Sequence, residues 1–431
     1  MDELRTLFLL LVFFTWVVNP VYAAIQRGRA FAIFSAVVMT ISNTGALAVH
    51  ARLPDWVSAA WLPVLEVGFV YGVAAAALHY AHLVRARLRP GLFRVLVSGP
   101  GQAFVASGFM SAFWLLGLVV LRAPLALFGF DEMLRWLAPL DLVPYAAGLV
   151  ALFTSSRPRS EVVRIRLDGG SKGDFTRVPV ERYRRRTPTP LASRPLRIVQ
   201  IADPHIGPWL APTQLRAIVD DLVGKQPDLV LLTGDFLTME SNASPQALAE
   251  ALAPLERLSD RCFAIFGNHD HEAPEVVRAG LAANGIQLLV DDSVCADTEA
   301  GPVQIVGADY RRRDREEHLA TLLARHPRID HHLRLLLLHD PSAFHDLPDD
   351  DVDLVLSGHT HGGQVGLVSF GLDWTVLSRS RWPDQGLFAR GRSHLYVHRG
   401  TGFYGFPLRV GVPGEASVLE LSVGSHAWAP R

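Results

Sequence analysis

Residues 196–207 read LRIVQIADPHIG, an apolar run of strand-forming residues that ends in Asp203 and His205. The same pattern recurs further along the chain as DLVLLTGD (228–235), CFAIFGNHD (262–270), LRLLLLHD (333–340) and VDLVLSGHTHGG (352–363). Continuous apolar runs of this length are typical of strands buried on both faces of a sheet. Helical patterns are predicted between and beside them at 212–224, 245–258, 275–283 and 314–324. This alternation predicts an α/β domain.

Polar side chains follow each of these runs directly. In open α/β sheets, ligands bind outside the carboxyl ends of the strands, so we expect these side chains to meet at one edge. Aspartate, histidine and asparagine in the absence of cysteine suit Mn, Fe or Zn. The candidate metal ligands are Asp203, His205, Asp235, Asn268, His339, His359 and His361.

A pair of ions is the arrangement that this set of ligands favours. Two ions about 3.5–4 Å apart can clamp the attacking and leaving oxygens of a displacement at phosphorus. A carboxylate that reaches both ions is needed to hold them so close, and Asp235 is the natural bridge. A lone Asp-x-His or a lone histidine is more often a turn or core residue. Five such motifs in order, each after an apolar run, favour the metal centre.

The composition divides the chain of 431 residues into two parts. Residues 1–155 carry 17 charged side chains and residues 156–431 carry 66, while the mean hydropathy of the whole is +0.22. We therefore expect a transmembrane region at 1–155, a linker at 156–195 in which a short strand at Glu161–Leu167 is possible, and a globular domain at 196–431. The net charge of -1 gives no overall basic field, so no nucleic acid binding is expected.

About five membrane helices are predicted, since a bilayer core needs about 20 apolar residues. They are Thr6–Ile25, Ala30–Val49, Ala59–Leu83, Ala103–Leu121 and a weaker fifth at Trp136–Phe153. With five spans, the arginine-rich loops lie on one side, which predicts a multi-pass protein of the cell membrane with its globular domain in the cytoplasm. With four spans the domain would lie on the other side, and the count is left open. Glu66 inside the third span is either functional or paired with a neighbouring helix.

The sequence leaves the role of two groups of arginines open between two alternatives. Arg182, Arg184, Arg185 and Arg186 in the expected linker either contact anionic headgroups or form a solvated charge run. Arg311, Arg312 and Arg313 either hold a substrate phosphate or are solvated as well.

The ordered motifs from Asp203 to His361 resemble the calcineurin-like metallophosphoesterase superfamily, over Leu196 to about Leu421. GHTHGGQ and the segment 395–421 resemble its bacterial membrane-associated branch, which includes YkuE-like and YaeI-like phosphodiesterases. The resemblance implies a four-layer αββα sandwich with a dinuclear metal centre. It also implies that one metal is bound by Asp203, His205 and His361, and the other by Asn268, His339 and His359.

The resemblance also implies roles for residues beside the metals. His269 would donate a hydrogen bond or a proton to the leaving oxygen, and Asp270 would orient His269. The expected function is a membrane-tethered phosphohydrolase, a phosphodiesterase or phosphomonoesterase, whose substrate could be a lipid-linked phosphate or diphosphate. The alternative is a transporter or sensor whose globular domain only binds ligand. Metal analysis followed by a phosphodiester assay would separate the two.

Overall fold

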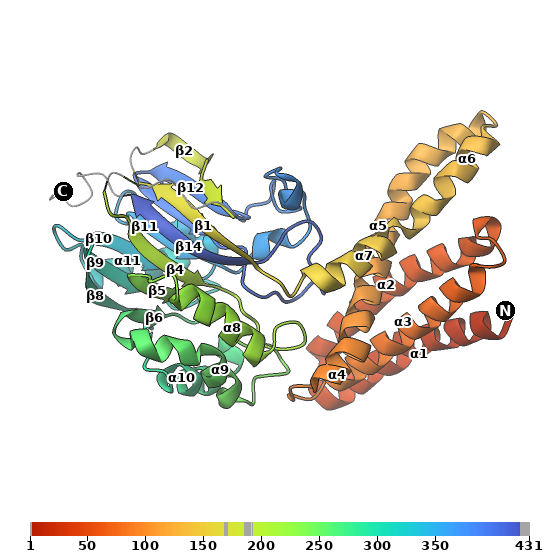
Figure 1. The fold of residues 1–431 in the computed structure, drawn as a ribbon, viewed down its shortest axis with the longest axis horizontal. Helices are drawn as coiled ribbons and strands as arrows, with labels where there is room; N and C mark the ends of the chain where they lie inside the picture. Colours follow the sequence, from red (N-terminus) through yellow and green to blue (C-terminus); the bar gives the residue numbers. More distant parts are fainter. Residues whose placement is uncertain (1, 168–170, 185–190, 192, 423–431) are drawn as a thin grey trace. The chain divides into compact units, whose positions relative to one another are not determined.

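The computed structural model describes residues 2–167, 171–184, 191 and 193–422, and divides the chain into two compact units. The first unit contains Met1–Thr154 with Gly405–Val410, and the second contains Ser155–Tyr404 with Gly411–Arg431. Figure 1 follows the chain through both units, and each unit is described by itself.

The first unit is helical. Five of its segments are long and apolar enough to cross a membrane, at Glu3–Arg27, Arg29–Trp56, Leu62–Leu83, Gly91–Leu127 and Asp131–Thr154. The elements within them are α1 (Asp2–Arg27), α2 (Arg29–Trp56), α3 (Leu62–Leu83), α4 (Gly91–Phe93), η1 (Arg94–Ser98), α5 (Gly99–Leu127), α6 (Asp131–Leu137), η2 (Ala138–Leu142) and α7 (Val143–Thr154). This unit therefore contains the predicted multi-pass helices, including the weaker fifth.

Ionisable groups inside this helical unit are paired across helices. Glu66 of α3 is buried and contacts Nε2 of His50 on α2 at 2.5 Å. Asp141 accepts hydrogen bonds from Arg52 and Arg122, each at 2.7 Å. Of the two interpretations of Glu66, the structure therefore supports pairing with a neighbouring helix, since an unpaired charge in an apolar environment is costly.

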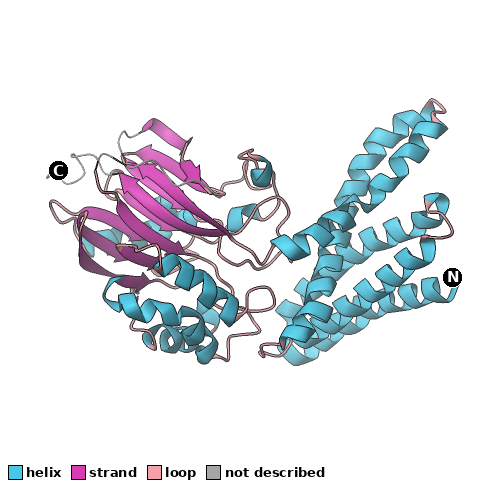
Figure 2. Cartoon of the chain, viewed as in Figure 1, coloured by secondary structure: helices cyan, strands magenta, loops and turns pink. Residues whose placement is uncertain are grey.

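The second unit contains two stacked sheets, drawn in magenta in Figure 2. The first sheet has the order β3 (Glu181–Tyr183), β1 (Arg159–Arg166), β14 (Glu415–Ser422), β4 (Leu196–Ile201), β5 (Leu229–Leu232), β6 (Cys262–Ala264) and β7 (Gln287–Leu288). The second has the order β2 (Ser171–Val178), β12 (Gly386–Gly391), β13 (Ser393–Val397), β11 (Leu354–Ser357), β10 (Leu333–Leu337), β9 (Gly301–Gly307) and β8 (Asp292–Thr298).

Apolar side chains from both sheets fill the space between them. Ile198 of β4 and Leu231 of β5 are in the same core cluster as Leu335 of β10 and Leu356 of β11, and all four are fully buried. Alternate residues of the strands face away from this core. Because these residues are apolar as well, the outer faces of the sheets are covered by helices. The helices are α8 (Pro212–Val223), α9 (Pro245–Leu252), α10 (Pro274–Ala282) and α11 (Arg315–Arg325), with short turns η3 (Ala253–Arg261), η4 (Asp270–Glu272), η5 (Pro341–Asp346), η6 (His361–Gly363) and η7 (Val368–Phe370).

Helices cover the outer faces of the two sheets. Figure 1 shows α8, α9 and α10 beside the first sheet, and α11 packs on the second sheet through a core cluster that includes Leu322 and Leu336. The predicted sandwich of helices, two sheets and helices is confirmed. The strands β4, β5, β6 and β7 run parallel, as do β9, β10, β11 and β13, so their carboxyl ends meet at one edge.

Within the predicted linker at 156–195 the structure has three strands, β1, β2 and β3, and the first overlaps the short strand expected at 161–167. β1 pairs in parallel with β14, β3 pairs with β1, and β2 pairs with β12 of the other sheet. The charges of this stretch find partners far along the chain. Arg164 donates to Glu420 at 3.0 Å, for example, so a charged stretch still makes a sheet.

Candidate metal centre

The predicted ligands of the first metal lie together. The ligand atoms of Asp203, His205 and His361 all lie within 4.8 Å of one another, and all three residues are buried. Asp203 and His205 follow β4, while His361 comes from the loop after β11. The Asp203 carboxylate also accepts from the backbone N–H of His359, at 2.8 and 3.0 Å, which fixes it against that loop.

The predicted ligands of the second metal form a second group beside the first. Asp235, His339 and His359 place their ligand atoms within 4.8 Å of one another. Nε2 of His339 lies 3.3 Å from Nδ1 of His359 and 3.2 Å from Oδ1 of Asn268. The loops after β5, β6, β10 and β11 thus contribute one side chain each.

Asp235 lies between the two groups. Its Oδ2 is 3.5 Å from Nε2 of His205 and 3.2 Å from Nε2 of His339. One carboxylate oxygen therefore reaches a ligand of each group, which is the position the sequence predicts for a bridging residue.

Backbone carbonyls orient the imidazoles of both groups. Nδ1 of His339 is 2.7 Å from the carbonyl of Thr233, and Nδ1 of His205 is 3.3 Å from that of Leu237. A hydrogen bond at Nδ1 turns Nε2 toward the centre of the site, as in known metal sites. These hydrogen bonds from the ligand imidazoles to backbone carbonyls could not be predicted from the sequence.

The protonation states of two of the ligand imidazoles, His205 and His359, favour metal binding. Burial lowers the pKa of His205 to about 3, and burial together with the nearby His339 lowers the pKa of His359 to about 4. Both rings are therefore neutral near pH 7, the form that binds metal. Burial disfavours charge on His339 too, but the Asp235 carboxylate outweighs it and raises the pKa of His339 to about 10. The carboxylates of Asp235 and Asp203 thus stabilise a positive charge at the position of the His339 ring.

These residues fit a pair of divalent cations. Nε2 of His205 is buried and has no hydrogen-bond partner among the described residues, so a cation would complete its environment. The donor set of imidazole nitrogens and carboxylate and amide oxygens is the one that Mn, Fe and Zn accept.

The backbone at the site is strained. Asp203, His205, Asp235, His359 and His361 all have positive φ, between 44° and 70°. Residues other than glycine pay a free-energy cost in this region, and such residues cluster at functional sites. The sequence analysis missed this feature, which places five ligand side chains at sharp turns.

Two glycines allow the loops to approach closely. A Cβ on Gly358 would lie 2.3 Å from Oδ2 of Asp203, and one on Gly234 would lie 2.3 Å from the backbone nitrogen of Gly267. Any larger residue at these positions would push a ligand or its loop out of place.

His269 lies at the mouth of the site. Its side chain is 32% exposed, and its backbone N–H donates to Oδ1 of Asp235 at 2.8 Å. Its ring lies edge-on to Tyr404, with centroids 5.0 Å apart, and the Tyr404 ring stacks on His205 at 5.1 Å. A substrate that reaches the ligands would pass these two rings.

The prediction that Asp270 orients His269 is wrong. The carboxylate of Asp270 is buried and accepts three backbone N–H groups, from Asp235 at 2.6 Å, Phe236 at 2.9 Å and Gly267 at 2.8 Å. It therefore joins the loops after β5 and β6. Glu272 is the residue that contacts His269, with Oε1 at 2.9 Å from Nδ1. Neighbouring positions in the sequence were misleading because the two side chains have different partners, backbone N–H groups for Asp270 and Glu272 for His269.

Of the arginines that follow Tyr310, Arg311 lines a small pocket that also includes the ligand His339. Arg311, Arg312 and Arg313 are exposed, and Arg311 pairs with Asp291 at 3.8 Å. The solvated interpretation agrees with these positions.

Comparison with known proteins agrees with this geometry. The calcineurin-like phosphoesterase family matches residues 196–363. The chain is 29% identical to the uncharacterized metallophosphoesterase YkuE of Bacillus subtilis, over 52% of this chain and 78% of that protein. It is 30% identical to phosphodiesterase YaeI of Escherichia coli, over 53% and 82%. It is also 28% identical to the transmembrane protein with metallophosphoesterase domain of Bos taurus, over 57% and 55%.

The matched region contains the motifs from Asp203 to His361, and the apolar helices precede it. This chain is therefore a membrane protein and a phosphate ester hydrolase that belongs to the calcineurin-like phosphoesterase family, in the branch of YkuE and YaeI.

Proposed function

We propose that the second unit hydrolyses phosphate esters at a centre of two divalent metals, Mn, Fe or Zn, with Asp235 as the bridging ligand. The position of the Asp235 carboxylate carries this proposal. Its Oδ2 lies within 3.5 Å of His205 and 3.2 Å of His339, one from each ligand group. A single metal site would not need a shared oxygen between two such groups.

In this proposal Asp203, His205 and His361 hold one ion, and Asn268, His339 and His359 hold the other. The chemistry that two such ions supply is a nucleophilic water near neutral pH and neutralisation of charge on the phosphate. Asp270 keeps the loops of Asp235 and Asn268 in place through its three backbone hydrogen bonds.

His269 acts on the leaving group. Its exposed imidazole donates a hydrogen bond or a proton to the leaving oxygen, and Glu272 holds the ring by its Nδ1 so that Nε2 is presented to the substrate. Burial lowers the pKa of His269, but its contact with Glu272 and the nearby Asp235 outweigh burial and raise the pKa above the ordinary value. The ring is therefore better able to carry a proton.

The substrate is proposed to be a lipid-linked phosphate or diphosphate, processed at the cell membrane with the catalytic unit on the cytoplasmic side. Five apolar helices in the same chain support a substrate at or near the bilayer. The arginines at the ends of the first, third and fifth helical segments support the cytoplasmic side.

A direct test is hydrolysis of bis(p-nitrophenyl) phosphate by the purified full-length protein with added Mn²⁺. We expect wild-type turnover, and loss of at least about a thousandfold in Asp235→Asn and His359→Ala, because each removes a ligand of the electrostatic centre. Asp260→Asn is the matched control, since its side chain is 74% exposed and pairs with the neighbouring Arg261 rather than with a ligand residue. Undiminished turnover in Asp235→Asn would refute the proposal, and ligand binding without turnover would favour the sensor alternative.

A further inference from the structure

A second polar cavity lies in the same unit and is not part of the metal centre. It has a volume of about 340 Å³ and is lined by residues of the β2–β3 turn, the start of β12 and the η7 turn. Four arginines line it, and its apolar walls include Val180 and Leu387. Cavities of this size hold small ligands in proteins.

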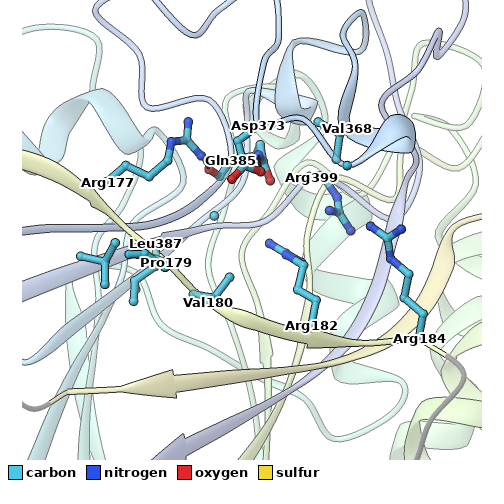
Figure 3. A pocket seen from close by; sticks show the side chains of 13 residues that line it. Arg177, Pro179, Val180, Arg182, Arg184, Val368, Asp373, Gln385, Leu387 and Arg399 are labelled. Carbon is cyan, nitrogen blue, oxygen red and sulfur yellow. Dashed lines mark hydrogen bonds between the residues drawn. The ribbon is translucent and has the colours of Figure 1, made fainter.

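Three of the arginines, Arg182, Arg184 and Arg399, line one side of the cavity, as Figure 3 shows. Arg177 lies on the other side, where it donates to the carbonyl of Gln385 at 2.6 Å. Asp373, the acidic lining residue, contacts the side chain of Gln385 at 3.5 Å.

Buried carboxylates hold these guanidinium groups in place. Glu161 of β1 is buried and accepts from Arg182 at 2.6 Å, from Arg184 at 3.4 Å and also from Arg399. Glu415 lies 3.4 Å from Nε of Arg399 and 3.7 Å from Nη1 of Arg182. Three guanidinium groups thus share two carboxylates, which leaves one positive charge in excess on this side of the cavity.

The arginines also have donors directed away from these carboxylates. Nη2 of Arg182 is buried and has no hydrogen-bond partner among the described residues. Within the described parts of the chain, Arg184 donates from Nε to Glu161, and its side chain, which lines the cavity, is 39% exposed. Planar guanidinium groups with spare N–H donors match the geometry of phosphate oxygens.

The cavity adjoins the loop that carries two metal ligands. Thr360 donates to the carbonyl of Asp384 at 2.6 Å, and Arg177 pairs with Asp384. Arg399 packs against Gly362, where an added Cβ would lie 3.3 Å from its Cγ. The cavity is therefore separate from the metal centre but shares structure with it.

We propose that this arginine cavity, defined by Arg177, Arg182, Arg184 and Arg399, is a second anion site that binds a phosphate group. The phosphate belongs to a soluble molecule or to a lipid headgroup, and its oxygens accept from Arg182 and Arg184. If the arginines only paired with Glu161 and Glu415, we would expect these carboxylates to accept from every buried guanidinium N–H. Nη2 of Arg182, however, has no hydrogen-bond partner among the described residues.

The test is titration calorimetry on the full-length protein in detergent, in a His359→Ala background that weakens phosphate binding at the metal centre. Inorganic phosphate and dihexanoyl phosphatidic acid are the two probes. We expect at least one probe to bind and Arg184→Ala to weaken it by about tenfold or more, the loss of one charge-assisted contact. Binding of inorganic phosphate assigns a soluble source, and binding of phosphatidic acid alone assigns a headgroup.

Arg257→Ala is the matched control, because Arg257 is exposed and pairs with Asp220 away from the cavity. Arg182→Lys keeps the charge but not the planar group, so we expect an intermediate loss. If His359→Ala does not fold, chelator-treated wild-type protein takes its place. Binding of neither probe, or equal affinity in Arg184→Ala, would overturn the inference, and neither result depends on hydrolysis.

Discussion

Asp270→Asn tests the loop-joining role of Asp270 with almost no change in side-chain shape. Oδ2 of Asp270 accepts from Asp235 and Gly267, and Oδ1 accepts from Phe236. An asparagine can present its oxygen to one side only, so its NH₂ group must face at least one backbone N–H. Replacing this acceptor and leaving a buried donor unpaired each cost about 1–3 kcal/mol, so we expect about 2–6 kcal/mol in total.

The assay combines thermal unfolding of the full-length protein with hydrogen exchange of peptides that contain Asp235, Phe236 and Gly267. We expect protection of these amides to fall by about thirtyfold or more, the equivalent of 2 kcal/mol. Glu272→Gln is the matched control. It removes a carboxylate that contacts the side chain of His269, whereas the three backbone amides donate to Asp270. Its effect on these amides should be small.

A double-mutant cycle with His269→Ala provides the refutation. If Asp270 joins the loops, its substitution costs the same amount in the His269→Ala protein as in wild type, within about 0.5 kcal/mol. The effect of Glu272→Gln on turnover should disappear in that background. If instead the Asp270→Asn effect disappears with His269 removed, the side chain acts through His269 and our assignment is wrong.

Three further predictions concern the glycine at the ligand loop, the buried ion pairs and the metals. Gly358→Ala should abolish metal binding, measured as metal content, because its Cβ would lie 2.3 Å from Oδ2 of Asp203; unchanged metal content would contradict this. Burial opposes the charge of Glu415, but His398, Arg399 and Arg182 hold its pKa well below the usual range. The ionised Glu415 therefore stabilises the folded state at pH values above its unfolded pKa, and this stabilisation is lost as the pH falls below about 5. Glu415→Gln should therefore cost about 3–5 kcal/mol at pH 7 and flatten the acid limb of the melting temperature, and a parallel limb would refute it. Chelation should lower the melting temperature of wild-type protein, because each bound ion at a hundred times its Kd stabilises the fold by about 3 kcal/mol, but should leave the melting temperature of Asp235→Asn little changed.

The strands that carry the ligands could be predicted from the sequence because they are buried on both faces. LRIVQI at 196–201 and DLVLL at 228–232 are mainly apolar, and their carboxyl ends lead directly into the ligand residues. The same property predicts a common edge for the ligands, and the structure places all seven candidates there.

Of the first three strands, only a possible short strand at 161–167, which overlaps β1, could be predicted, because the stability of these strands depends on distant partners. Glu161 in β1 is buried with Arg182 and Arg399, the latter 238 residues away, so an apparently polar stretch is interior. The role of Asp270 failed for a similar reason, since its three donors lie in loops brought together only by the fold. The arginines at 311–313 and Arg182 look alike in sequence, and only burial separates their roles.

The most direct test of the central claim is the anomalous scattering of a crystal of the full-length protein grown with Mn²⁺. The account predicts two anomalous peaks about 3.5–4 Å apart, both within coordination distance of the Asp235 carboxylate, one also beside His205 and the other beside His339. A single peak, or two peaks that do not share Asp235, would contradict it.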